Sequence, residues 1–207
     1  MKNIERSKYE KNIEKKEIVQ YAGSEKVNMS LSVNSQIEEG LLMQRLTELY
    51  DNPIEASVRE VVSNSIDATS SLGDLGKIEI FKPSRLNPVF IVKDNGCGMT
   101  KETLLEIYSK YGSSTKRSDL NQIGSYGLGA KSPLAYTTHF TVDSVKDGLS
   151  TVLVVSKGEH TNHLEIISQT PTDRENGTTV SIPVYTEDLE KFSNAVDVYL
   201  SSPDEKN

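Results

Sequence analysis

The chain has 207 residues, a formal net charge of −7 and 35% hydrophobic residues, which suffices for one domain with a real core. The acidic balance argues against nucleic acid as a partner, and the single cysteine, Cys97, excludes a disulfide within the chain and indicates a reducing compartment. No apolar run approaches the roughly 20 residues of a membrane span, and the first residues lack the apolar core of a secretory signal. We therefore expect a cytoplasmic protein without a transmembrane segment.

Charge dominates residues 1–26, which predicts a solvated helix or a disordered arm, while 201–207 form a short tail. In the domain between them, over 27–200, hydrophobic periodicity predicts helices over 36–50, 53–72, 100–111 and 186–202, and strands over 27–33, 77–82, 89–94, 139–145, 151–156, 163–169 and 178–184. Pro53 suits the first turn of its helix and Thr100 can cap the next one. Early helices and late strands predict an α+β fold, namely a two-layer α/β sandwich with helices on one face of a mixed, mostly antiparallel sheet.

Residues 123–132 read IGSYGLGAKS and place glycines at Gly124, Gly127 and Gly129, a GxxGxG pattern. This spacing matches neither the dinucleotide fingerprint nor the P-loop. Glycines nevertheless let the backbone approach an anion, and a helix beginning near Leu128 would direct free N–H groups at a phosphate. The run is therefore either a phosphate loop or an ordinary glycine-rich turn.

A polar stripe marks the predicted helix over 53–72. Glu60, Asn64 and Asp67 are spaced i, i+4 and i+7, so they share one side of the helix. The amide oxygen of Asn64 suits Mg²⁺, and a glutamate one turn earlier could deprotonate a water. The alternative is a solvated helix face.

Two further polar positions lie at strand ends. Asp94 ends the strand VFIVKD before the turn NGCG, and its carboxylate would suit the exocyclic amino group of adenine. A turn aspartate that bonds its own backbone is the alternative. Thr178 begins a strand after Gly177, where its hydroxyl could support Asp94 and a bridging water or simply cap a turn.

Four motifs follow in a fixed order along the chain: REVVSNSIDA (ExxxN), KDNGCGM (DxGxG), IGSYGLGAKS (GxxGxG) and NGTTVSI (GT). This order resembles the GHKL superfamily of gyrases, Hsp90-type chaperones, histidine kinases and MutL-type repair proteins. The resemblance implies the Bergerat ATP-binding fold, with ATP or ADP and Mg²⁺ as ligands. It also implies that Glu60 is the general base, that Asn64 binds Mg²⁺ and that Asp67 supports the pocket.

The same resemblance assigns the remaining site residues. Asp94 would receive the adenine amino group with help from Thr178, and Gly96 and Gly98 would let the backbone pass close to the base. Met99 would pack either on adenine or in the core, and Lys131 would either meet a phosphate or be exposed. The triphosphate would be held by Lys116 and by the glycine loop with its neighbours: Gly124, Tyr126, Gly127, Leu128, Gly129, Ala130 and Lys131.

The stretches LYDNPIEASVREVVSNSIDA, YGSSTKR and LGAKSPLAYT are similar to the N-terminal region of phage rIIA-like proteins. That likeness implies an rIIB-like partner, lysis inhibition and resistance to host exclusion, in the cytoplasm of a host cell or peripheral to its membrane. His139, His160 and His163 all follow the glycine loop, so a sensor kinase is not expected. Three functions remain open: a slow ATPase whose ATP-dependent homodimer acts as a switch, a binding module with negligible turnover, and a fragment of an Hsp90-, MutL- or topoisomerase-like ATPase.

Overall fold

The computed structural model describes residues 19–21, 24–28, 51–109, 129–158 and 162–201. The helix predicted over 36–50, most of the strand predicted over 27–33 and the tail after 201 lie outside these ranges. So does most of the glycine-rich loop.

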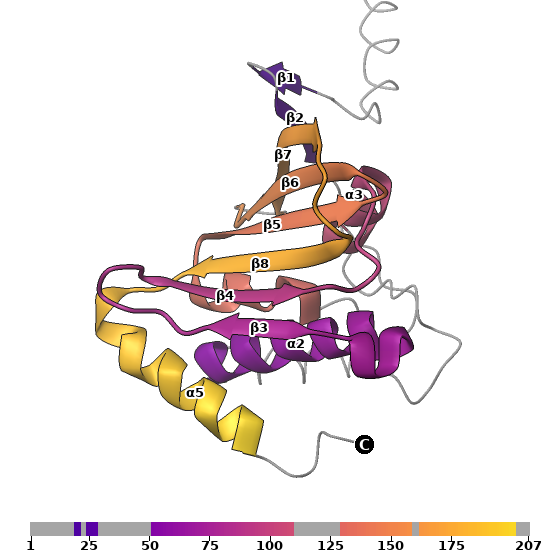
Figure 1. Cartoon of the computed structure of the whole chain (residues 1–207). Helices are drawn as coiled ribbons and strands as arrows, with labels where there is room; N and C mark the ends of the chain where they lie inside the picture. The colour runs from indigo at the N-terminus through magenta and orange to yellow at the C-terminus, as the bar shows by residue number, and fades with distance from the viewer. Residues whose placement is uncertain (1–18, 22–23, 29–50, 110–128, 159–161, 202–207) are drawn as a thin grey trace, which may run out of the picture.

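An eight-stranded sheet forms one layer of the fold, with strand order β1-β2-β7-β6-β5-β8-β4-β3 (Figure 1). The strands are β1 (Val19–Tyr21), β2 (Ser24–Asn28), β3 (Ile78–Phe81), β4 (Val89–Asp94), β5 (His139–Lys146), β6 (Leu149–Ser156), β7 (His163–Pro171) and β8 (Gly177–Pro183). All seven pairings among them are antiparallel. The α+β sandwich is confirmed, but the parallel component of the predicted mixed sheet is absent from the described strands. Tight turns explain this, because hairpins such as Asp147-Gly148 return the chain antiparallel to the preceding strand.

Helices cover one face of the sheet, and in Figure 1 this face is turned away from the viewer. They are α2 (Pro53–Thr69), η2 (Ser70–Leu75), α3 (Lys101–Ser109), η3 (Gly129–Lys131), α4 (Pro133–Tyr136), η4 (Thr186–Asp188) and α5 (Leu189–Ser201). Pro53 lies in the first turn of α2 and the Thr100 hydroxyl accepts a bond from the Thr103 N–H, as expected for both starts. The helix expected near Leu128 is only a 3₁₀ turn followed by the single turn of α4.

Two other elements differ from the sequence prediction. The helix predicted to reach residue 72 ends as an α-helix at Thr69 and continues as the 3₁₀ helix η2, which is kinked at Gly73, where φ is 53°. Strands β1 and β2 occupy Val19–Tyr21 and Ser24–Asn28, within or at the edge of the segment expected to be a charged arm. Charged residues hide such strands from a hydrophobicity pattern, and they are common in strands near a sheet edge.

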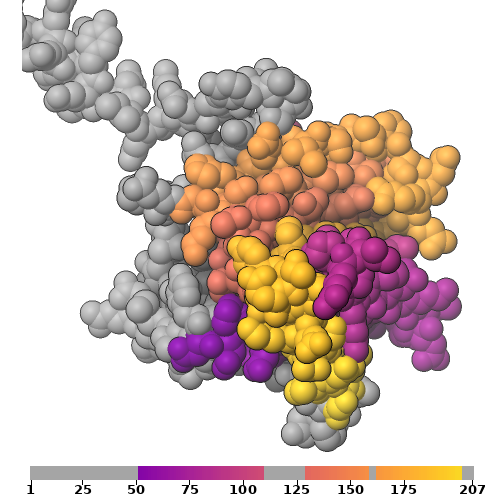
Figure 2. Space-filling view, turned by 90° about the vertical axis from the view of Figure 1, so that its left-hand side faces the viewer, coloured from indigo at the N-terminus to yellow at the C-terminus, as the bar shows by residue number. Residues whose placement is uncertain are grey.

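The core lies between the sheet and the helices. Alternate strand residues point to the helices, and the largest fully buried side chains on this side include Phe90, Phe140, Leu153 and Ile182. Helix α5 closes the end of the core: Phe192 is buried, and the Ser63 and Tyr199 hydroxyls are 2.9 Å apart. Figure 2 shows α5 (yellow) between the start of α2 (indigo) and the magenta segment around β3 and β4. We call the side of the sheet under the helices the covered face and the other side the open face.

Candidate nucleotide-binding site

A row of polar residues crosses the covered face. Strand register aligns Asp94 with Thr178, Thr178 with Ser144 and Ser144 with Thr151. Paired residues of neighbouring strands point to the same face of a sheet. All four are buried, with exposures of 6% for Asp94, 9% for Thr178, 0% for Ser144 and 2% for Thr151. The fold therefore places Asp94 and Thr178, which are 84 residues apart, side by side beneath α2.

Asp94 is held by three hydrogen bonds. Its Oδ1 accepts from the Gly96 N–H at 2.9 Å and from the Thr178 N–H at 3.2 Å, and its Oδ2 accepts from the Ser65 hydroxyl at 3.2 Å. Burial raises the pKa of Asp94, and the two backbone bonds and the Ser65 bond oppose this rise. A carboxylate oxygen accepts more than one bond, so Oδ2 retains capacity for a further donor such as an amino group.

The direct contacts of Thr178 come from two different groups, and its predicted support of Asp94 through a bridging water stays a prediction. The backbone N–H, and not the hydroxyl, bonds directly to Asp94. The hydroxyl is 3.1 Å from the Ser144 Oγ, on the next strand. This arrangement follows from the register, because the Thr178 side chain points along the covered face towards its partner on β5.

The turn after Asp94 needs its glycines because it packs against backbone. A Cβ at Gly96 would lie 2.6 Å from the Ala68 carbonyl oxygen of α2. Gly98 has a φ of 64°, and a Cβ there would overlap the Val145 carbonyl oxygen. Met99 is half-buried and packs on the hydrophobic core, so the core alternative describes its contacts.

The polar stripe of α2 is only partly solvated. Glu60, Asn64 and Asp67 are all half-buried, and the Glu60 side chain is 16% exposed. The Glu60 carboxylate lies against Gly129, so that a Cβ on this glycine would meet Oε2. Its other oxygen is 3.4 Å from the Arg59 guanidinium. Glu60, the first residue of the stripe, thus contacts the last glycine of the GxxGxG run.

Lys131 is buried, so the exposed alternative does not describe it. It is 4% exposed, and its Nζ donates to the Ile107 carbonyl oxygen, in the last turn of α3, at 2.7 Å. Burial lowers the pKa of this ammonium group to about 7. Lys131 therefore joins the two described segments that flank residues 110–128.

The other loop residues divide in two groups. Ala130 is half-buried and packs against the core. Outside the described residues lie Lys116, Gly124, Tyr126, Gly127 and Leu128, whose assignments remain predictions.

Sequence reasoning missed Ser65 and Ser144. Ser65 directly follows Asn64, and its small side chain is 3% exposed on the side of α2 that faces β4. Ser144 occupies an inward position of a strand that otherwise alternates with Phe140 and Val142. A polar residue at an apolar position of an alternating strand was the available signal.

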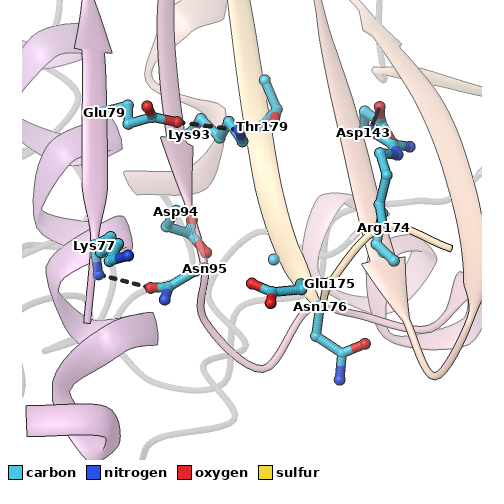
Figure 3. Close-up of a pocket in the computed structure, with 12 residues that line it drawn as sticks. Lys77, Glu79, Lys93, Asp94, Asn95, Asp143, Arg174, Glu175, Asn176 and Thr179 are labelled. Carbon is cyan, nitrogen blue, oxygen red and sulfur yellow. Dashed lines mark hydrogen bonds and ion pairs between the residues drawn. The ribbon is translucent and has the colours of Figure 1, made fainter. Parts of the chain in front are cut away.

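A hollow of about 450 Å³ lies on the open face, opposite the polar row (Figure 3). Two ion pairs lie at its sides, Lys93 with Glu79 at 3.1 Å and Arg174 with Asp143 at 2.9 Å. Asp94 is also one of the lining residues, but its carboxylate bonds to Ser65 of α2 on the covered face. The covered face, which carries the converging polar groups, is the better candidate site.

The described residues contain no candidate membrane-spanning helix and no candidate cluster of metal ligands. None of their helices is long and apolar enough to cross a bilayer. Within the same ranges, no group of three or more His, Cys, Asp or Glu side chains could hold a metal ion.

An antiparallel sheet covered by helices on one face defines a two-layer α+β domain, and the hydrogen-bonded Asp94 beside a glycine turn marks its candidate site. The family model described as "Histidine kinase-, DNA gyrase B-, and HSP90-like ATPase" matches residues 50–193. The match covers more than half of the chain, which therefore belongs to this family of ATPases. The ligand of such domains is ATP with Mg²⁺, and this chain is an ATP-binding domain of the Hsp90-like type.

Chaperones are among the similar proteins. The chain is 31% identical over 135 residues to chaperone protein HtpG of Rickettsia prowazekii, covering 54% of this chain and 22% of the relative. It is 28% identical over 172 residues to HtpG of Rickettsia bellii, covering 72% and 27%, and 30% identical over 124 residues to an endoplasmin homolog of Hordeum vulgare, covering 49% and 15%. The chain thus spans about a quarter or less of the length of these relatives.

Proposed function

We propose that this domain hydrolyses ATP slowly, with Glu60 as the general base. The observation that carries the proposal is the contact between the Glu60 carboxylate and Gly129, the last glycine of the GxxGxG run. A base must lie within hydrogen-bond reach of the attacking water. A carboxylate that contacts the end of the glycine-rich loop would lie close to such a water if the loop holds the triphosphate.

The covered face supports specific roles in nucleotide binding. Asp94 accepts the adenine amino group through Oδ2, while Gly96 and Thr178 hold its other oxygen. Gly98 brings the turn close to the base without a side chain in between. Asp67 borders the pocket from α2, and the loop residues Lys116, Gly124, Tyr126, Gly127, Leu128 and Ala130 complete the site by resemblance.

The residues present also fit a magnesium ion. Asn64 offers an amide oxygen from a half-buried position one turn after Glu60, and oxygen is the ligand that Mg²⁺ prefers. When bound, the ion would neutralise charge on the triphosphate oxygens. Lys131 donates to the Ile107 carbonyl oxygen, and because an ammonium group has three N–H donors it would also be able to donate to a phosphate.

The biological role rests on the sequence resemblance to phage rIIA-like proteins. We infer a phage-encoded, cytoplasmic protein in which ATP drives a homodimer switch, with an rIIB-like partner and a role in lysis inhibition and in counteracting host defence. Light scattering with and without ATP tests the dimer, and copurification of a tagged chain with an rIIB-like protein tests the partner. A strict monomer under all nucleotide conditions would contradict the switch.

The catalytic proposal is tested by phosphate release from Glu60→Ala, with Glu55→Ala as the matched control. Glu55 is an exposed glutamate in the first turn of the same helix. Glu60→Ala should lower the hydrolysis rate by about 10²–10⁴-fold and leave ATP affinity nearly unchanged, whereas Glu55→Ala should change neither. Gly129→Ala, which pushes a methyl group into the Glu60 carboxylate, should also slow hydrolysis. Unchanged turnover in Glu60→Ala would remove this residue from the mechanism, and ATP binding without turnover in the unmodified protein would indicate a binding module.

A further inference from the structure

Ser144 lies in the second half of β5 on the covered face, and none of the four sequence motifs includes it. The residue is 0% exposed and stands between Thr178 of β8 and Thr151 of β6. A buried polar side chain costs stability unless its hydrogen bonds are made. Its partners therefore indicate what the residue does.

Three groups bond to the Ser144 hydroxyl. The Met99 N–H donates to it at 2.8 Å, the Thr178 hydroxyl is 3.1 Å away, and the Gly177 carbonyl oxygen is 3.3 Å away. A serine hydroxyl has one donor and two acceptor sites. All three bonds are satisfied at once when Ser144 donates to Gly177 and accepts from both Met99 and Thr178.

These partners belong to the two segments that hold Asp94. Met99 ends the turn whose Gly96 N–H bonds the Asp94 carboxylate, and Thr178 donates its own N–H to the same oxygen. Ser144 has no direct bond to Asp94 among the described contacts, but it joins both of the segments that do. Its hydroxyl thereby fixes the distance between the turn after β4 and the start of β8.

We propose that Ser144 is a positioning residue that sets the selectivity of the site for a purine with a 6-amino group. The inference rests on the proposed adenine contact of Asp94. Loss of the hydroxyl leaves the Met99 N–H and the buried Thr178 hydroxyl without this partner, which lets the two segments shift. The Asp94 carboxylate then loses its alignment with the amino group, while the phosphate end of the site keeps its residues.

The experiment compares two nucleotides, ATP and purine riboside triphosphate, which lacks the 6-amino group. Their dissociation constants are measured by calorimetry for the unmodified protein, Ser144→Ala and Ser150→Ala, well below each melting temperature. Ser150 is the matched control: it is 4% exposed in β6, but it bonds Asp143 and Arg174 on the open face. Ser144→Cys keeps the side-chain volume and weakens the hydrogen bonds, so it gives the same comparison if the alanine variant does not fold.

The unmodified protein should prefer ATP by roughly 10–150-fold, the value of a charge-assisted hydrogen bond. Ser144→Ala should bind ATP about tenfold more weakly. The logarithm of its preference for ATP over purine riboside triphosphate should fall by at least about half. Ser150→Ala should keep the full preference. A purely structural role would weaken both nucleotides equally, so an unchanged preference in folded Ser144→Ala or Ser144→Cys would overturn the inference. An unmodified protein without any preference for ATP would instead overturn the adenine contact of Asp94, and the inference with it.

Discussion

Neighbouring residues of the same strands serve different purposes on the two faces of the sheet. Asp94 and Ser144 point to the covered face, where hydrogen bonds hold them in a buried network. Lys93 and Asp143, one residue earlier in the same strands, point to the open face and form ion pairs. The side chains of the Lys93 pair are 57% and 56% exposed, so water screens that pair almost fully.

Polar residues on the two faces contribute differently to the stability of the fold. An unsatisfied polar group in the buried network costs about 1–3 kcal/mol, whereas exposed ion pairs contribute about 0–1 kcal/mol. Polar residues on the covered face therefore need a fixed geometry, and this is the property a selective binding site requires. Charges on the open face are free to vary with little effect on the fold.

The largest difference in stability is expected between alanine substitutions at two glycines. Gly98→Ala combines a φ of 64° with an overlap onto the Val145 carbonyl, so it should lower the free energy of unfolding by about 2–5 kcal/mol. Gly148→Ala, in the β5–β6 turn, has a φ of 77° but its nearest neighbour is 3.8 Å from the added Cβ. It should therefore cost only about 1–2 kcal/mol. Urea denaturation checks both, and equal losses would contradict the close packing of the turn on β5.

Lys131 should have a smaller effect on the free energy of unfolding, and this effect depends on pH. Burial lowers its pKa from 10.5 to about 7, so the unfolded chain binds more protons than the folded one between these values. Stability should accordingly rise with pH above about 7, by up to about 1.4 kcal/mol per pH unit from this group. Lys131→Met should remove that part of the slope.

The control for this prediction is Lys93→Met, which removes an exposed lysine from the open face. Urea denaturation of the three proteins at pH 7, 8 and 9 gives the slopes. Parallel pH dependences for Lys131→Met and the unmodified protein would show that Lys131 is not desolvated in the native state.

The smallest effect is expected on the open face itself. Arg174 pairs with Asp143 through two nitrogens, at 2.9 and 3.1 Å, but its side chain is 53% exposed. Arg174→Ala should cost less than about 1 kcal/mol, a loss that shrinks in high salt, and should leave ATP affinity unchanged. A loss of several kcal/mol in thermal or urea denaturation would refute the contrast between the faces.

Much of the fold could be predicted because local patterns determine it. Alternation in β4 and β5 indicated which residues share a face, and the Pro53 and Thr100 signals located two helix starts. The position of Asp94 at a strand end was likewise visible in the turn that follows it. These features depend on residues close together in the sequence.

The remaining features depend on contacts between distant segments. The sequence does not reveal that Lys131 reaches the end of α3, or that the Thr178 hydroxyl turns to Ser144 while its N–H serves Asp94. Strand β2 pairs with β7, from Glu25 with Ile166 to Asn28 with His163, although the two strands are well over 100 residues apart in the chain, and its charged residues Glu25 and Lys26 gave no strand signal. Tertiary contacts override local preference at all of these positions.

The central claim is that the covered face, at Asp94, binds adenine. Calorimetric titration of ATP into Asp94→Asn and Asp143→Asn tests it most directly, because the two carboxylates lie on opposite faces of neighbouring parts of one sheet. With both variants shown to be folded, we expect Asp94→Asn to lose about 1.5–3 kcal/mol of binding free energy and Asp143→Asn to bind ATP like the unmodified protein. Unchanged affinity in Asp94→Asn, or a comparable loss in Asp143→Asn, would contradict the account.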